Sequence, residues 1–189
     1  MTITSERMKT MFYISDIYTT SPTSFQTPLQ EKTYEALKHL NIAFERVETD
    51  EAITMDDCIL INEKLNMKMV KTLFLCNRKK TLFFIFVTCG NKSFNASAFS
   101  QAMGCSRVSF ASEELFLEML GTKIGAATVF SSMIDLDGDI HIVIDQDVVN
   151  EEFYGCSDGT TTNYLKIKTQ DVIQKFLPYA KHPAHVIEI

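Results

Sequence analysis

The sequence predicts a single α+β domain with a mixed β-sheet and flanking helices, from three observations. Residues 69–76 and 81–89 are two apolar runs separated by a short polar turn, which is typical of a hairpin at the centre of a sheet. Helical patterns lie before and after that pair in the chain. The order of elements is mixed rather than a strict strand–helix alternation, which favours an α+β fold.

The chain divides into an arm and one domain. Residues 1–27 are rich in Ser and Thr and lack a sustained helical or strand period, so we expect a loosely ordered N-terminal arm. Residues 28–189 show no internal repeat and no linker, so one folded domain is expected there.

Before the hairpin, the pattern predicts a helix, a strand and a second helix. Apolar residues recur at helical spacing from Leu29 to Leu40, and residues 42–47 then alternate as a short strand. Thr54 precedes a pair of acidic residues, as at a helix N-terminus, which predicts a helix from there to about residue 66.

After the hairpin, helix starters, apolar spacing and apolar runs predict further elements, with Thr169 expected to cap the last helix. The predicted helices cover 95–103, 112–120 and 169–177, and the predicted strands cover 126–133, 140–144, 164–167 and, at an edge, 186–189.

An acidic turn between two of these strands resembles a calcium loop only in part. Asp135, Asp137 and Asp139 alternate along it, but an EF-hand needs a glycine after its third acidic ligand and a glutamate at its twelfth position. Gly138 comes too early and the twelfth position is Gln146. We therefore expect a hairpin turn of the Asp-Gly type and no metal.

Composition restricts partner and compartment. A formal charge of −6 is unlike that of a protein that coats nucleic acid, so no DNA partner is expected. No apolar run approaches the ~20 residues of a membrane span, and none of signal-peptide length lies at the N-terminus. The five cysteines are widely spaced without a CxxC pair, as in proteins with reduced thiols. A cytoplasmic protein that does not contact membranes is therefore expected.

One stretch is basic although the whole chain is acidic. No acidic residue occurs from residue 64 to residue 80, which suits contact with a phosphate backbone. The alternative is a solvated turn flanked by isolated lysines. The basic residues are Lys64, Lys68, Lys71, Arg78, Lys79 and Lys80.

The sequence motifs of nucleotide, dinucleotide, zinc-protease and serine-hydrolase sites are absent, so no cofactor is expected.

Two further stretches are not explained by ordinary packing. In residues 120–128, glycine in a small-residue turn lets the backbone approach a ligand and aim N–H groups at it. Residues 155–162 offer hydroxyls and a carboxylate, which suits a small polar or carbonyl-bearing ligand. The alternative for this second stretch is a long polar β-turn.

Together these segments resemble the YbaK/prolyl-tRNA-synthetase-associated family, in particular its free-standing prolyl-tRNA editing proteins. The likeness extends over residues 28–189 and is strongest at residues 70–77, 106–111 and 142–145, which occur in the family's order. The resemblance implies a compact α+β domain with a curved mixed sheet. It also implies hydrolysis of the ester that joins a wrong amino acid, commonly alanine, to tRNA-Pro.

The resemblance assigns roles to residues. It places Lys71 near the terminal phosphate or ribose, and the turn at Gly125 and Ala126 where backbone donors meet the substrate. Ser157, Asp158, Thr161 and Thr162 would shape the amino-acid pocket. From the charge of the basic stretch, and not from the resemblance, we expect Lys68, Arg78, Lys79 and Lys80 to contact the tRNA acceptor stem.

The chain departs from the family at two places. Residues 124–128 read Ile-Gly-Ala-Ala-Thr where the family has Pro-Gly-Ser-Val-Ser, and the histidine and asparagine of the family's Cys-His-Pro-x-x-Asn-Thr run are missing from residues 155–162. Three hypotheses follow. The first is a deacylase that acts in trans on mischarged tRNA, with prolyl-tRNA synthetase as a further partner. The second is a module that binds tRNA or a synthetase without hydrolysis, and the third is a hydrolase of another small ester.

Overall fold

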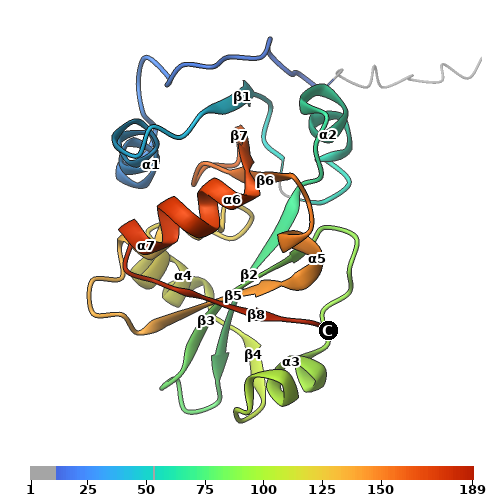
Figure 1. The fold of residues 1–189 in the computed structure, drawn as a ribbon, viewed down its shortest axis with the longest axis vertical. Coiled ribbons are helices and arrows are strands. Elements are labelled where there is room, and N and C mark those ends of the chain that lie inside the picture. Colours follow the sequence, from blue (N-terminus) through green and yellow to red (C-terminus); the bar gives the residue numbers. More distant parts are fainter. Residues whose placement is uncertain (1–11, 53) are drawn as a thin grey trace, which may run out of the picture.

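The computed structural model describes residues 12–52 and 54–189, which form two β-sheets with helices packed against them (Figure 1). The helices are α1 (Pro28–His39), α2 (Ile59–Leu65), α3 (Ala96–Met103), α4 (Glu113–Leu120), α5 (Gln146–Val149), α6 (Thr169–Asp171) and α7 (Leu177–Tyr179), with the 3-10 helix η1 (Val129–Met133) and the π-helix η2 (Val172–Phe176). The strands are β1 (Phe44–Glu48), β2 (Val70–Asn77), β3 (Phe83–Cys89), β4 (Val108–Phe110), β5 (Ile140–Asp145), β6 (Phe153–Ser157), β7 (Asn163–Lys168) and β8 (Ala184–Ile187).

The larger sheet is mixed, as expected. Its strand order is β4-β2-β3-β5-β8. The predicted hairpin is confirmed, because β2 and β3 pair antiparallel from Val70↔Cys89 to Cys76↔Phe83. β5 joins β3 in parallel, and β8 joins β5 in parallel at the edge. The α+β fold class is therefore confirmed.

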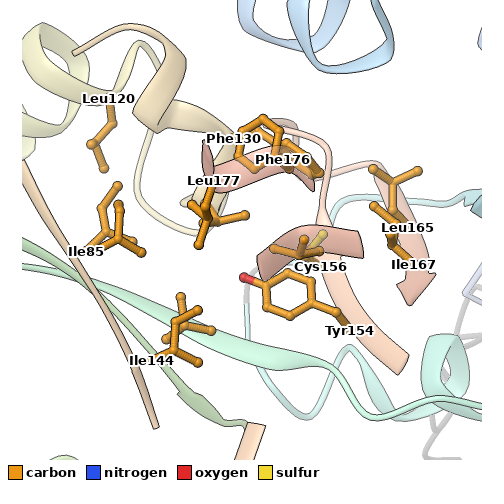
Figure 2. Packing of buried hydrophobic residues seen from close by; sticks show 14 of the residues in the cluster. Ile85, Leu120, Phe130, Ile144, Tyr154, Cys156, Leu165, Ile167, Phe176 and Leu177 are labelled. Atoms are coloured by element: carbon orange, nitrogen blue, oxygen red, sulfur yellow. The ribbon is translucent and has the colours of Figure 1, made fainter. Parts of the chain in front are cut away.

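The smaller sheet is antiparallel, with strand order β1-β7-β6. It meets the larger sheet at a bridge between Met69 and Gly155. The main hydrophobic cluster lies between the sheets and includes Ile85 and Ile144 of the larger sheet and Cys156 and Leu165 of the smaller one (Figure 2). This packing brings the ends of β2 and β6 together.

The described part of the predicted arm runs along β1. Arg46 and Tyr18 exchange backbone hydrogen bonds of 2.8 and 2.9 Å, and the Arg46 guanidinium lies 4.7 Å from the centre of the Tyr18 ring. Residues 1–11 of the arm lie outside the described residues.

The strand predicted over residues 126–133 is wrong, because this stretch contains η1. The Thr128 side chain accepts a hydrogen bond from the Phe130 N–H and caps the helical turn. An apolar run of this length is common to buried strands and buried helical turns. β5 is paired on one edge with β3 and on the other with β8, so residues 126–133 have no free edge of β5 beside which to form a strand.

The acidic turn is consequently a loop between η1 and β5 and not a strand hairpin. The Asp135 carboxylate accepts hydrogen bonds from the N–H groups of Asp139 and Ile140 at 3.1 and 2.7 Å. It also lies 2.9 Å from Nε2 of the buried His182, which joins the loop to the segment before β8.

Two predicted helix starts are also corrected. Thr54 and Asp57 bond to each other in a turn, and α2 itself begins at Ile59. Lys168 takes the cap position of the last helix in place of Thr169, and the helical segment passes through η2 before ending at Tyr179. No helix within residues 12–52 and 54–189 has the length and apolar character needed to cross a bilayer.

Candidate active site

A cavity of about 390 Å³ lies where β2, β6 and the loop before η1 meet. We call it the Lys71 cavity. Its wall is mainly apolar, with Lys71, Ser157 and the turn at Gly125 as polar elements. The lining residues are Ala52, Met55, Cys58, Met69, Val70, Lys71, Thr72, Leu73, Phe74, Phe110, Ala111, Phe116, Ile124, Gly125, Ala127, Cys156, Ser157 and Tyr164.

Lys71 is half-buried near the start of β2. Its ammonium donates a hydrogen bond of 2.8 Å to the backbone carbonyl oxygen of Lys92. A lysine ammonium is a compact charge with three donors, so the remaining N–H groups can meet an anionic ligand.

The turn that leads to η1 presents backbone to the cavity. Gly125 has a φ of 91°, which favours glycine because other residues are strained in this region. The N–H of Ala126 donates to the carbonyl oxygen of Lys123 at 3.1 Å, and Ala126 is fully buried. Among the described residues the N–H groups of Ile124, Gly125 and Ala127, which all line the cavity, have no hydrogen-bond partner, so this turn leaves backbone donors for a ligand.

The turn between β6 and β7 is polar and almost completely buried. The Ser157 hydroxyl donates to the carbonyl oxygen of Thr160 and accepts from the N–H of Gly159. Asp158 is 0 % exposed, and its carboxylate accepts from Gln30 Nε2 and the Tyr34 hydroxyl at 2.8 and 3.0 Å. The hydroxyl and N–H of Thr160 complete its partners.

Burial raises the pKa of Asp158 above its usual 3.8, although all of these donors act in the opposite direction. Only Ser157 of the predicted pocket residues lines the cavity, whereas Asp158 lies behind the wall and ties the turn to α1.

The two turns are linked to each other. The Thr122 hydroxyl donates to the carbonyl oxygen of Gly159 at 3.0 Å. The Thr161 hydroxyl and the Lys123 ammonium both donate to Glu51, at 2.9 and 2.6 Å, and these bonds lower the pKa of Glu51. Outside this network, the Thr162 hydroxyl accepts a hydrogen bond of 2.9 Å from Gln26 in the arm. Thr161 and Thr162 therefore fix the turn and do not line the cavity.

The thiols of the cavity are protonated at neutral pH. Burial, followed by the charge of Asp57, raises the pKa of Cys58 to about 11. Burial also raises the pKa of Cys156, with the nearby Asp158 acting in the same direction. The thiolate is the nucleophilic form of cysteine, so neither side chain is poised for covalent catalysis.

The predicted tRNA-binding residues are not brought together. Lys68 lies near the start of β2 and pairs with Glu151. Arg78, Lys79 and Lys80 are exposed in the β2–β3 turn, at the opposite end of β2 from Lys71. The rise per residue of a β-strand puts this turn roughly 20 Å from Lys71. That turn points away from α1 and α2 (Figure 1).

Sequence reasoning missed several residues beside Lys71. Lys92 follows β3 and contacts Lys71 through its carbonyl oxygen, and the fully buried Asp145 ends β5. Phe110 is 61 % exposed at the rim of the cavity. The sequence feature that could have predicted Asp145 is a carboxylate at the end of an apolar run. No local sequence feature distinguishes Lys92 or Phe110 as a site residue.

Comparison with known proteins identifies the family. Residues 50–175 match the model of the aminoacyl-tRNA editing domain, and this match covers more than half of the chain. The chain belongs to the aminoacyl-tRNA editing domain family.

Two relatives agree with this assignment. The chain is 24% identical over 156 residues to prolyl-tRNA synthetase associated domain-containing protein 1 of Danio rerio, covering 82% of this chain and 84% of that protein. It is 25% identical over 141 residues to the prolyl-tRNA editing protein ProX of Acetoanaerobium sticklandii, covering 74% and 86%.

Two solved structures share the fold. The hypothetical protein APE2540 superposes with a TM-score of 0.64 at 16% identity, covering 81% of this chain and 96% of that one. A protein described as a proposed trans-editing enzyme for prolyl tRNA synthetase superposes with a TM-score of 0.62 at 13% identity, covering 87% and 99%.

Proposed function

We propose that this chain is a trans-acting deacylase that hydrolyses the ester bond of mischarged tRNA, with alanine or another small amino acid on tRNA-Pro as the substrate. One observation carries the proposal: in a chain of the editing family, the Lys71 ammonium, the Gly125 turn and the Ser157 turn line one cavity. The names of two relatives, which refer to prolyl-tRNA editing and to prolyl-tRNA synthetase, support the choice of tRNA.

The proposed reaction uses water as the nucleophile. An aminoacyl ester is activated, so a positioned water can attack its carbonyl carbon without a catalytic triad. The carbonyl carbon–oxygen bond to the ribose then breaks, the ribose oxygen takes a proton, and a free amino acid and an uncharged tRNA are released. The protonated thiols of Cys58 and Cys156 leave no side-chain nucleophile of higher reactivity among the cavity residues.

Charge and backbone donors would assist this reaction. The Lys71 ammonium attracts the terminal phosphate or ribose and so places the ester in the cavity. Backbone N–H groups of the Gly125 turn would donate to the carbonyl oxygen as negative charge develops on it. The exposed ring of Phe110 at the rim suits stacking against the unpaired terminal base.

Selectivity would depend on the volume of the cavity. Met55, Met69 and Phe116 are among the bulky side chains that line the cavity. A pocket that excludes a larger side chain by contact can discriminate by about 1–3 kcal/mol per methylene. Small amino acids are therefore the expected substrates.

The test is hydrolysis of a panel of mischarged tRNAs by the wild type and by Lys71→Ala. Alanine, serine, threonine and cysteine esters on tRNA-Pro are compared with alanine on a noncognate tRNA. Release of one amino acid that depends on Lys71 supports the proposal. Lys175→Ala is the matched control, because Lys175 pairs with Asp171 on the C-terminal helical segment and does not line the cavity.

A second function, binding of tRNA or of a synthetase without hydrolysis, is favoured by the Ser157 turn. The Ser157 hydroxyl and the Asp158 carboxylate are both engaged in holding the turn. They are therefore not free as acid or base. Stoichiometric binding of tRNA with no release from any ester would select this function, whereas release from small esters but not from tRNA would indicate another hydrolase.

A further inference from the structure

The position of the Lys71 ammonium depends on one loop. Lys71 donates to the backbone carbonyl oxygen of Lys92, which lies in the segment between β3 and α3. Lys92 lines a second cavity, of about 950 Å³, that shares Met55, Met69 and Val70 with the Lys71 cavity. The contact therefore lies where the two cavities adjoin.

The side chain of Lys92 anchors this loop to β5 and α5. Its ammonium lies 2.8 Å from the Asp145 carboxylate and 2.9 Å from that of Asp147. The hydrogen bonds that the Lys92 ammonium donates to these two carboxylates, with the bond to Asp145 the stronger, raise the pKa of Lys92. Lys92 therefore stays charged throughout the neutral range.

Asp145 makes the anchor rigid. Its side chain is 0 % exposed, and besides the Lys92 ammonium it accepts hydrogen bonds from the Thr88 hydroxyl at 2.7 Å and from the Asp147 N–H at 3.2 Å. Thr88 is the partner of Lys71 in the β2–β3 register. A buried carboxylate without a cationic partner is strongly unfavourable, so Asp145 requires the Lys92 ammonium in this position.

We propose that Lys92 is a positioning residue for Lys71. Its side chain, held by Asp145 and Asp147, fixes the carbonyl oxygen that holds the Lys71 ammonium at the cavity. This inference rests on the proposed function, in which Lys71 places the ester. A displacement of about 1 Å in such a group lowers a rate by up to about 100-fold, so the anchor affects turnover although it does not touch the ester.

The first experiment measures single-turnover deacylation, with both the rate at saturation and the tRNA concentration at half-saturation. Lys92→Met is expected to lower the saturated rate by about 10- to 100-fold. Lys92→Arg, which keeps a cation for Asp145 and Asp147, is expected to retain most of the rate. Lys175→Met, which removes a lysine from an ion pair away from the cavity, serves as the control.

A double mutant separates positioning from general stability. If Lys92 acts through Lys71, adding Lys92→Met to Lys71→Ala causes no further loss of rate. An independent loss in the double mutant, or a rate for Lys92→Met that equals or exceeds the wild-type rate, would overturn the inference. Thermal unfolding of each variant confirms that the folded protein is compared.

A second readout does not depend on activity. Competitive acetylation of the lysines, followed by mass spectrometry, reports how accessible the Lys71 amine is. Lys92→Met is expected to raise the acetylation rate of Lys71 several-fold, whereas Lys92→Arg leaves it unchanged. An unchanged acetylation rate of Lys71 in the Lys92→Met variant would overturn the inference that Lys92 positions Lys71. If the wild type releases no amino acid but acetylation changes as expected, the proposed function fails while the anchor stands.

Discussion

The two sides of the Lys71 cavity are held in place by different means. On the β2 side, the half-buried Lys71 ammonium makes one hydrogen bond, to a backbone carbonyl oxygen. On the β6–β7 side, Asp158 is fully buried, and Gln30, Tyr34 and Thr160 donate to it. The first side can present its side chain to a ligand, whereas the second uses its side chains for the fold. Substitutions on the two sides should therefore separate activity from stability.

The largest effect is expected for Asp158→Ala. The substitution leaves buried donors of Gln30, Tyr34 and Thr160 without an acceptor, which should lower the free energy of unfolding by about 3 kcal/mol. Urea unfolding monitored by circular dichroism measures this loss. Asp137→Ala, at an exposed position, is the control and should change stability little. A loss below about 1 kcal/mol would contradict a structural role for Asp158.

Lys71→Ala should show the opposite behaviour. We expect the deacylation rate to fall about 100-fold, because the group that places the ester is lost. The free energy of unfolding should change by less than about 1 kcal/mol, since the lost hydrogen bond is one of a half-buried side chain. Single-turnover kinetics and urea unfolding of the same preparation test both. A large loss of stability would show that the two sides do not differ as described.

Thr122→Val tests the link between the two turns. Valine has a similar shape but cannot donate to the Gly159 carbonyl oxygen, so stability should fall by about 1 kcal/mol. Because the link also sets the distance between the Gly125 turn and the Ser157 turn, half-saturation with tRNA should shift to higher concentration. Thr81→Val is the control, since Thr81 is exposed and bonds to Asn77 in the hairpin turn. Equal half-saturation for both variants would argue against a linked pair of turns.

The smallest expected effect is a change in the pH dependence of stability. The folded-state pKa of Asp158 is raised by burial, so the folded protein binds its proton more tightly than the unfolded chain does. The stability that this group contributes is full below its ordinary pKa of 3.8 and is lost as pH rises through the raised folded value. The stability difference between wild type and Asp158→Asn should therefore decrease with rising pH.

Asp135 provides the opposite sign for comparison. Burial acts to raise its pKa, but the hydrogen bonds from His182, Ile140 and Asp139 outweigh burial and lower it. Its contribution is present above 3.8 and is lost as pH falls through the folded value. Urea midpoints of Asp158→Asn and Asp135→Asn across acidic pH check both slopes. Slopes of the same sign would contradict the different environments of these two carboxylates.

The local hydrophobic pattern was sufficient to predict secondary structure where it was compatible with only one kind of element. The apolar runs on either side of Asn77 predicted the hairpin, because two buried strands joined by a polar turn have few other structures available. The run before Asp135 was misassigned, since a buried helical turn has the same apolar composition as a buried strand. The Thr128 cap is a local contact that the apolar pattern does not reveal, whereas the pairing of β5 on both edges is a tertiary feature.

The candidate site was predicted in part for the same reason. Gly125 and Ser157 were selected from their own segments and Lys71 from the family resemblance, and the fold brings all three to one cavity. Asp158 looked equally suited to bind a ligand, because a polar side chain in a turn has the same sequence signature whether it faces solvent, a ligand or the core. Its burial follows from the packing of α1 over the turn.

The sequence by itself determined the α+β class, the central hairpin and the segments that carry the polar groups, since these depend on periodicity and turn chemistry within a few residues. Only the tertiary structure decided which polar side chains face the cavity and which are consumed by the fold. It also joined Lys71 to Lys92 and Asp145, which lie 21 and 74 positions further along the chain. Such contacts are set by strand register and sheet packing, which bring distant residues within hydrogen-bond distance without any local signal.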